Sequence, residues 1–202
     1  KDPGVIASDK LSSSGDMHKN GQVITLKFTS GFKLVYKPRS LSIDLHFQQL
    51  LSWLNDNGVA VPFRILKILN CGSYGWAEFI THESCSSEAE IERFYYRQGG
   101  HLALLYALRG EDFHNENLIA SGEYPVLVDL ETVFCQQIGN PSDENFNPIN
   151  NSVMTVGLLP FPEYGNDENR GIDFSGLSGY SGQLTPYKLP KLEGTGTDEI
   201  RI

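Results

Sequence analysis

The stretch D-F-H-N-E-N at residues 112–117, followed by V-D-L-E at residues 128–131, decides the expected fold. Asp112 and Asn117 are five residues apart, the offset that phosphoryl-transfer enzymes use between a catalytic base and a metal-binding Asn. Asp129 follows at the end of an expected strand, where a second Mg²⁺ ligand is needed, and a carboxylate with an amide suits that ion. His114 is a candidate to stabilise the transferred phosphate or to orient Asp112. The other interpretation is a polar turn whose side chains cap a helix or hairpin.

The segments around this stretch alternate between the apolar spacing of β-strands and that of α-helices. A hairpin is expected from strands at 23–28 and 33–37, followed by a helix at 42–57, a second hairpin at 64–80, a long helix at 87–108 and a third hairpin at 118–130. This order predicts an α+β fold with a two-lobed lipid-kinase or protein-kinase-like core, in which a small antiparallel β lobe precedes a larger, mainly helical lobe. The expected divisions are an N-terminal loop region at 1–21, the smaller lobe at 22–84 and an incomplete larger lobe with an activation-loop-like segment at 85–202.

Apolar spacing also predicts which faces are buried. One helical face is formed at i, i+3, i+4 and i+7 by Phe47, Leu50, Leu51 and Leu54. The apolar side of the long helix is expected to be Ile91, Phe94, Tyr95, Leu102 and Leu105. Core or packing positions are expected for Trp53, Trp76, Tyr95, Tyr96 and Arg97, and positions on the surface or on a helix for His46, His82 and His101.

Two further groups of residues are candidates for the site. Lys37 ends a strand before the first helix, where its charge on a long stem suits phosphate oxygens. Asp44 in that helix is a candidate ion-pair partner for Lys37, or a carboxylate that favours the helix N-terminus. Asp16 and His18 lie in a glycine-flanked loop that either reaches the site or is a turn.

Composition excludes several classes of protein. The formal net charge is -9, which argues against a nucleic-acid binder, and no apolar run is long enough to span a membrane. The 3 cysteines are an odd number without C-x-x-C spacing, which indicates free thiols and a cytoplasmic location. The chain opens with Lys1 and has no signal peptide, so we expect it to be a piece of a longer protein.

Several motifs in one order resemble the dehydratase domain of class II lanthipeptide synthetases, the LanM-type enzymes. They are G-D-M-H at 15–18, K-L-V-Y-K-P-R-S-L at 33–41, W-L-N at 53–55, R-F-Y-Y-R-Q-G-G at 93–100, D-F-H-N-E-N-L-I-A at 112–120, V-D-L-E-T at 128–132, G-L-L-P at 157–160 and D-F-S-G-L-S-G at 173–179. The resemblance implies an enzyme that uses ATP and Mg²⁺ to phosphorylate Ser and Thr of a ribosomally made precursor peptide. It then eliminates the phosphate, which gives dehydroalanine and dehydrobutyrine.

The resemblance also implies roles for single residues. Lys37 would bind ATP phosphates, and Glu131 would support the nucleotide site. Asp112 would activate the substrate hydroxyl, with His114 in the same loop. The Mg²⁺ ligands would be Asn117 and Asp129. Asp16 and His18 match active-site residues that serve phosphorylation or elimination.

The chain departs from the family in two respects. The family's cyclase domain and its zinc ligands are absent from the sequence, and so is the R-P-T motif that serves elimination. We therefore expect the phosphoryl-transfer half of a dehydratase, with the cyclase as its partner in the parent chain. A non-catalytic kinase-like module that binds nucleotide or peptide is the alternative, favoured by the missing glycine-rich loop. A metal-dependent hydrolase is a third, weaker interpretation.

Overall fold

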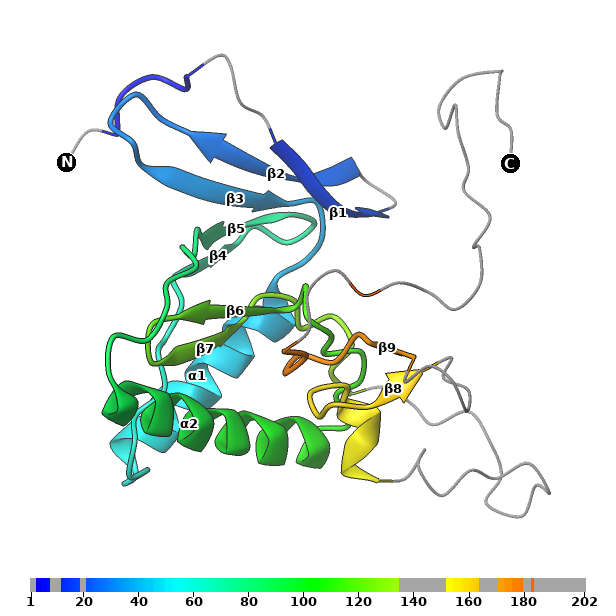
Figure 1. Ribbon diagram of the computed structural model, residues 1–202. Helices are drawn as coiled ribbons and strands as arrows, with labels where there is room; N and C mark the ends of the chain where they lie inside the picture. Colours follow the sequence, from blue (N-terminus) through cyan, green and yellow to red (C-terminus); the bar gives the residue numbers. More distant parts are fainter. Residues whose placement is uncertain are drawn as a thin grey trace, which may run out of the picture.

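The computed structural model describes residues 3–7, 12–18, 21–134, 152–163, 171–179 and 183, and for residues 12–18 it describes the backbone alone. Figure 1 shows a sheet above a lower body that holds both long helices. The expected kinase-like division into two lobes remains a prediction, as do its boundaries. Within the described residues no helix is both long enough and apolar enough to cross a lipid bilayer.

The upper layer is a five-stranded antiparallel sheet in the order β1-β2-β3-β5-β4. Its strands are β1 (Ser12–His18), β2 (Gly21–Lys27), β3 (Lys33–Lys37), β4 (Ile68–Asn70) and β5 (Gly75–Glu78). Both hairpins expected in this region, β2–β3 and β4–β5, are confirmed, although β4 and β5 are shorter than the expected segments.

The expectation of a loop over residues 1–21 is wrong for residues 12–18. These residues form β1, which pairs with β2 at the edge of the sheet and has an irregular register between Ser13 and Met17. A polar Ser- and Gly-rich segment has no apolar alternation to reveal a strand. At a sheet edge, main-chain pairing with β2 defines the strand instead.

One face of this sheet points toward the lower body. Thr25, Val35, Ala77 and Ile68 are paired in one row across β2, β3, β5 and β4, and all four line the cleft described below. Side chains two residues apart on a strand share a face, so Lys37 lies on the same side as Val35. The regular alternation of β3 therefore places a Lys at the cleft.

The lower body is built around two helices, α1 (Ser42–Asp56) and α2 (Glu88–Ala107). The apolar face expected for α1 is confirmed in that Phe47 and Leu51 are buried. They share a core cluster with Leu105 of α2 and with the buried residues Phe63, Phe113, Leu127, Leu130, Val133, Val156 and Leu158. Ser87 caps α2 by accepting a hydrogen bond from the backbone N–H of Glu90.

The expected apolar face of α2 is partly wrong. Its buried residues are Arg97, Gln98, His101 and Leu105, whereas Ile91, Tyr95 and Tyr96 are exposed. Arg97 is buried because its guanidinium donates to the carbonyl oxygens of Pro62 and Glu123 and lies over the Tyr124 ring. Polar groups of neighbouring segments thus turn the polar side of the helix inward.

The expectation of a core position is wrong for Trp53, which is 59% exposed, while Trp76 is half-buried beside Tyr36 on the outer face of the sheet. His101, expected on the surface or on a helix, is confirmed as a helix residue of α2, and its side chain is buried.

The later part of the described chain forms small elements, of which β7 and η2 contact α2. They are the hairpin β6 (Leu118–Ser121) and β7 (Tyr124–Leu127), the 3-10 helix η2 (Val153–Val156), and the paired strands β8 (Pro162–Glu163) and β9 (Ile172–Asp173). The hairpin expected between residues 118 and 130 is confirmed, although β7 ends at Leu127, so Asp129 follows the strand and is not part of it. Beyond residue 134, most of the larger lobe expected at 85–202 lies outside the described residues, and so does Cys135.

Candidate functional site

The Lys37 ammonium group lies inside the molecule at the end of β3. The residue is 7% exposed, and its Nζ donates to the carbonyl oxygen of Val128 at 2.5 Å. Asp129 Oδ1 is 3.7 Å from the same nitrogen. Lys37 and Asp129, which the sequence predicts separately as site residues, therefore lie close together in the fold.

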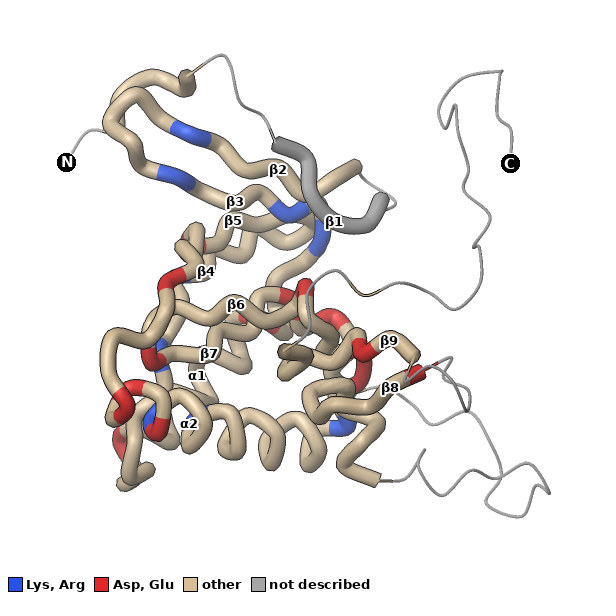
Figure 2. The backbone as a smooth tube through the Cα atoms, in the orientation of Figure 1, with Lys and Arg blue, Asp and Glu red and all other residues tan. Residues whose placement is uncertain are grey.

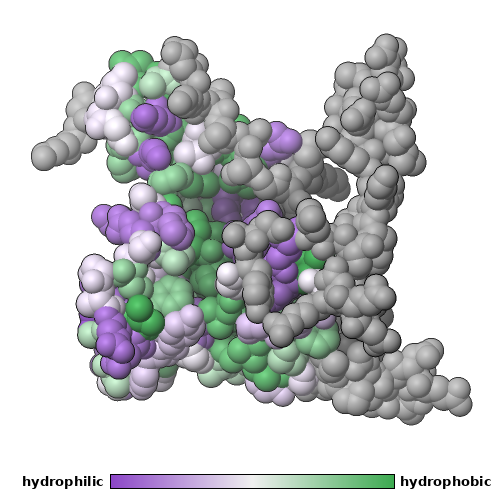
Figure 3. Space-filling model, viewed as in Figure 1, coloured by the Kyte–Doolittle hydropathy of each residue, from purple (hydrophilic) through white to green (hydrophobic). Residues whose placement is uncertain are grey.

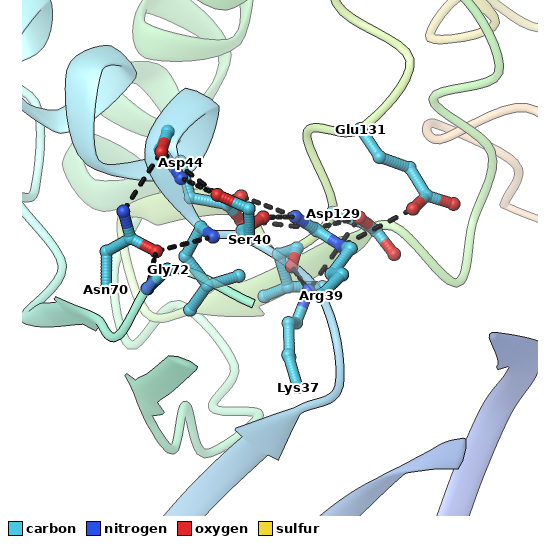
Figure 4. Close-up of polar contacts among 11 residues, drawn as sticks. Lys37, Arg39, Ser40, Asp44, Asn70, Gly72, Asp129 and Glu131 are labelled. Carbon is cyan, nitrogen blue, oxygen red and sulfur yellow. Dashed lines mark hydrogen bonds and ion pairs between the residues drawn. The ribbon is translucent and has the colours of Figure 1, made fainter. Parts of the chain in front are cut away.

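Arg39 links the carboxylates of this site. Figure 4 shows its guanidinium between helix α1 and the segment after β7. Arg39 donates to both carboxylate oxygens of Asp44, from Nη1 at 2.7 Å and from Nη2 at 3.3 Å. Nη2 also donates to Asp129 Oδ1 at 2.5 Å, and Nε lies 3.4 Å from Glu131 Oε2. Three carboxylates and two cations thus form one cluster.

Asp44 takes a different partner from the expected one. Of the two alternatives, the position at the helix N-terminus is confirmed, because Asp44 lies in the first turn of α1, whereas its ion-pair partner is Arg39 and not Lys37. The start of α1 is fixed by Asn70, whose Oδ1 accepts from the backbone N–H of Leu41 and whose Nδ2 donates to Ser42 Oγ. This contact from β4 sets where Asp44 stands relative to the sheet.

Burial and charge act on both proposed ligand-binding groups. Burial lowers the pKa of the Lys37 ammonium below its ordinary value; nearby Asp129 opposes this effect and Arg39 adds to it. Burial alone would raise the pKa of the Asp129 carboxyl, but Lys37 and Arg39 outweigh it and hold that pKa below its usual range. Asp129 is therefore a carboxylate at neutral pH, which is the form that binds cations.

The loop at residues 112–117 has a constrained backbone. Asp112 adopts a left-handed conformation with φ 62°, and Asn117 Nδ2 donates to the Asp112 carbonyl oxygen at 2.9 Å. The His114 ring is oriented by its own loop, because Nδ1 accepts from the backbone N–H of Glu116. The Asn117 carbonyl oxygen accepts from the N–H of Val128, which joins this loop to the segment that carries Asp129.

Two later segments hold the same loop from behind. The backbone N–H of Phe113 donates to Val156, and that of Asn115 donates to Phe174. Gly157 and Gly176 contact the Phe113 backbone so closely that an added Cβ would lie 2.9 Å from its nitrogen and 2.8 Å from its oxygen, respectively. Residues 157–160 and 173–179, noted as motifs in the sequence, therefore support the loop rather than contribute charges to it.

An apolar cleft of about 210 Å³ lies beside the charged cluster. Its walls come from the inner face of the sheet, from α1 and from the β6–β7 region, and Figure 3 shows apolar surface in the recess between the upper and lower parts. Val128, which accepts from Lys37, and Asp44, which pairs with Arg39, both line it. The charged residues that line the cleft are acidic (Asp44, Glu78 and Glu116), and Lys37 and Arg39 adjoin it through their contacts with Val128 and Asp44.

The remaining candidate residues are placed less fully. The side chains of Asp16 and His18 lie outside the described part of the structure, although their backbone belongs to β1.

In Figure 2 the basic residues of β2 and β3 lie above acidic residues of the lower body. Among the described residues no group of three or more His, Cys, Asp or Glu side chains is arranged to hold a metal. A cation at Asp129 would therefore need water or ligand oxygens as well.

Sequence reasoning missed Arg39 as a site residue. Its partner Asp129 is 90 positions away, and no local pattern shows such a pairing. The available signal was a second cation two residues after Lys37, separated from it by Pro38, shortly before a helix with an acidic first turn.

Comparisons with known proteins agree with the motifs. A family model described as Domain of unknown function (DUF4135) matches residues 2–202. The chain is also 33% identical over 183 residues to the Lacticin 481/lactococcin biosynthesis protein LcnDR2 of Lactococcus lactis subsp. lactis, an alignment that covers 84% of this chain and 20% of that relative. The chain therefore belongs to the DUF4135 family, a domain found in LanM-type lanthipeptide synthetases.

Proposed function

We propose that this domain binds ATP with Mg²⁺ in the cleft and transfers the γ-phosphoryl group to Ser and Thr of a lanthipeptide precursor peptide. The relative's printed name supports the pathway, and the site supports the reaction class. The observation that carries the proposal is the convergence of Lys37, Asp129 and the loop at 112–117 beside one apolar cleft. Phosphoryl transfer depends mainly on positioning and charge, which these groups provide.

The donor set fits both proposed ligands. The apolar row of Thr25, Val35 and Ala77 suits a purine ring, and Lys37 suits phosphate oxygens. Asp129 offers a carboxylate, and Asn117 offers its carboxamide oxygen because its nitrogen donates to Asp112. These are the hard oxygen ligands that Mg²⁺ takes together with water and phosphate. Bound Mg²⁺ would neutralise charge that develops on the phosphates.

Asp112 is the proposed general base. As the hydroxyl oxygen of the peptide Ser or Thr forms its bond to the γ-phosphorus, the bond from that phosphorus to the ADP oxygen breaks, and the Asp112 carboxylate accepts the hydroxyl proton. His114 stands two residues away on the same loop with a ring oriented by Glu116, so its other ring nitrogen is the one proposed to contact the phosphoryl group. Elimination of phosphate to dehydroalanine and dehydrobutyrine is proposed for the whole synthetase.

Mass spectrometry of a precursor peptide incubated with the protein, ATP and Mg²⁺ tests the proposal. Wild type is expected to add the mass of phosphoryl groups at Ser and Thr, and Asp112→Asn is expected to slow this by on the order of 10² to 10⁴, as for a lost general base. Asp56→Asn, a carboxylate at the far end of α1, is the matched control and should keep the wild-type rate. A phosphorylation rate unchanged by Asp112→Asn would remove the base assignment, and ATP binding without any transfer would favour the non-catalytic module.

A further inference from the structure

Lys37 and Asp129 lie side by side without forming a direct hydrogen bond. Their nearest charged atoms are 3.7 Å apart, and the side chains of Lys37 and Asp129 are 8% and 25% exposed. Each atom has a nearer partner instead: Lys37 Nζ is 2.5 Å from the carbonyl oxygen of Val128, and Asp129 Oδ1 is 2.5 Å from Arg39 Nη2. Both cations approach the same carboxylate oxygen, so they compete for it.

A buried ammonium and carboxylate attract each other strongly, because little water screens them. Closed into a hydrogen-bonded pair, Lys37 and Asp129 would neutralise each other. Lys37 would then lose its availability to an anionic ligand, and Asp129 its availability to a cation. The structure instead holds the two groups as an ion pair at 3.7 Å, and Arg39 Nη2, at 2.5 Å, is the nearer partner of the same Asp129 oxygen.

Arg39 is held in position to do this by helix α1. Asp44 binds both terminal nitrogens of its guanidinium, and the carbonyl oxygen of Ser40 accepts from Nη1 at 3.1 Å. The side chain of Arg39 is 13% exposed and that of Asp44 is 6% exposed, so solvent contributes little to holding them. A planar guanidinium can bridge two carboxylates at once, which a lysine ammonium of point-like charge does less well.

We propose that Arg39 is a positioning residue that prevents Lys37 and Asp129, which form an ion pair at 3.7 Å, from closing into a direct hydrogen-bonded pair and so keeps Lys37 available to nucleotide phosphates. The inference rests on the proposed function, because it assigns Lys37 to an anionic ligand. It adds a residue with its own role: Arg39 acts through Asp129 and needs no contact with the ligand. Its effect must therefore depend on the presence of the Asp129 carboxylate.

Binding of ATP in the absence of Mg²⁺ tests this dependence by a double-mutant cycle. Arg39→Gln is expected to raise the Kd for ATP on the order of 10-fold, because Lys37 becomes paired with Asp129. In the Asp129→Asn background the same substitution should change Kd less than about twofold, since no carboxylate remains to capture Lys37. An equal rise in the Kd for ATP in both backgrounds would overturn the proposal and indicate that Arg39 has a merely structural role.

Two further variants complete the experiment: Arg93→Gln as a control, and Arg39→Lys as a substitute for Arg39→Gln. Arg93→Gln removes another Arg–carboxylate pair, with Glu123, on the far side of the lower body, and should leave Kd unchanged. Thermal unfolding shows whether Arg39→Gln folds. If it does not, Arg39→Lys replaces it, with weaker ATP binding expected beside Asp129 and unchanged binding beside Asn at position 129. Unchanged ATP binding by Arg39→Lys in both backgrounds would then overturn the proposal.

A readout that needs no ATP separates this inference from the proposed function. The rate at which an amine-directed reagent labels Lys37, followed by peptide mass spectrometry, should fall several-fold in Arg39→Gln and recover in the Arg39→Gln, Asp129→Asn double variant. Failure of wild type to bind ATP would overturn the proposed function while this labelling pattern still tested Arg39. Labelling that does not respond to Arg39→Gln would overturn the Arg39 assignment alone.

Discussion

Lys37 carries its charge in a place where few lysines are found. It is 7% exposed, and burial lowers its pKa, so the ammonium is retained at a cost in stability. Removal of that charge should therefore harm ligand binding more than folding. The inward direction of Lys37 follows from the alternation of β3, which places it two residues after Val35 on the cleft side.

Lys37→Met, which keeps the length of the side chain and removes its charge, should raise the Kd for ATP by about 10- to 100-fold, the loss of one or two charge-assisted contacts. The free energy of unfolding should stay the same or rise. Isothermal titration calorimetry and urea unfolding measure the two effects. Lys67→Met, at an exposed lysine, serves as the matched control. An ATP affinity equal to wild type would exclude Lys37 from the phosphate site.

Local patterns predicted some of these residues and missed others for physical reasons. Lys37, Asp129 and Asn117 were predicted as site residues because an expected strand end or a fixed offset within one loop marks each of them, and the structure brings Lys37 and Asp129 to within 3.7 Å of each other. Arg39 was missed because its bridge to Asp129 depends on how β3 and β7 are placed in space. Ion pairs between distant segments leave no periodic signal.

At the scale of elements, the loop at 112–117 depends on backbone contacts with residues 157 and 176. Gly157 has φ 80°, and its Cα lies against the Phe113 nitrogen in a space that admits no Cβ. Both features require glycine. The geometry of Asp112, one residue before Phe113, is thus coupled to η2 and to the segment after β9.

Gly157→Ala should lower the free energy of unfolding by about 1–3 kcal/mol, because it adds a contact with Phe113 to a strained left-handed backbone. Gly122→Ala is the matched control, since Gly122 also has positive φ but has open space around an added Cβ. Gly122→Ala should lower the free energy of unfolding by a smaller amount, because it adds no contact of the kind that Gly157→Ala makes with Phe113. Urea unfolding of both variants measures the difference. Equal losses would show that Gly157 does not support the loop by close packing.

Periodicity predicted the existence of the elements better than their buried faces. The α1 face with Phe47 and Leu51 was predicted because its partners are apolar. The α2 face was misjudged at Ile91 and Tyr95, which are exposed, whereas the packing position expected for Arg97 is confirmed, because carbonyl oxygens of Pro62 and Glu123 accept from its guanidinium. Strand β1 was missed because it is a polar edge strand, so main-chain pairing rather than side-chain pattern defines it.

At the scale of the whole molecule, His101 introduces a pH-dependent term into stability. It lies on α2 between the rings of Phe47 and Phe63, and its Nε2 donates to the carbonyl oxygen of Pro125. Burial lowers the pKa of His101 to about 4; the Pro125 carbonyl opposes this effect and nearby Arg97 adds to it. The folded protein thus keeps a neutral imidazole where the unfolded chain takes up a proton.

The sign of the effect follows from linkage. Below the unfolded pKa of about 6.5 the unfolded state binds more protons, so stability falls as pH decreases from about 6.5 toward 4, at about 1.4 kcal/mol for each pH unit. Between pH 7.5 and pH 5 His101 should account for a loss of about 2 kcal/mol. Urea unfolding at several pH values measures it, and His101→Gln should flatten the pH slope by this amount. An unaltered slope in that variant would exclude His101 as its source.

The central claim is that Lys37, Asp129 and the adjoining cleft form a working nucleotide site. Thermal unfolding with and without ATP and Mg²⁺, in wild type and Asp129→Asn, tests it most directly. A ligand present at about 100 times its Kd stabilises the native state by about 2.7 kcal/mol, a rise of several degrees in Tm. We predict that rise in wild type, dependent on Mg²⁺ and lost in Asp129→Asn. A cooperative wild-type transition whose Tm does not respond to ATP and Mg²⁺ would contradict the claim.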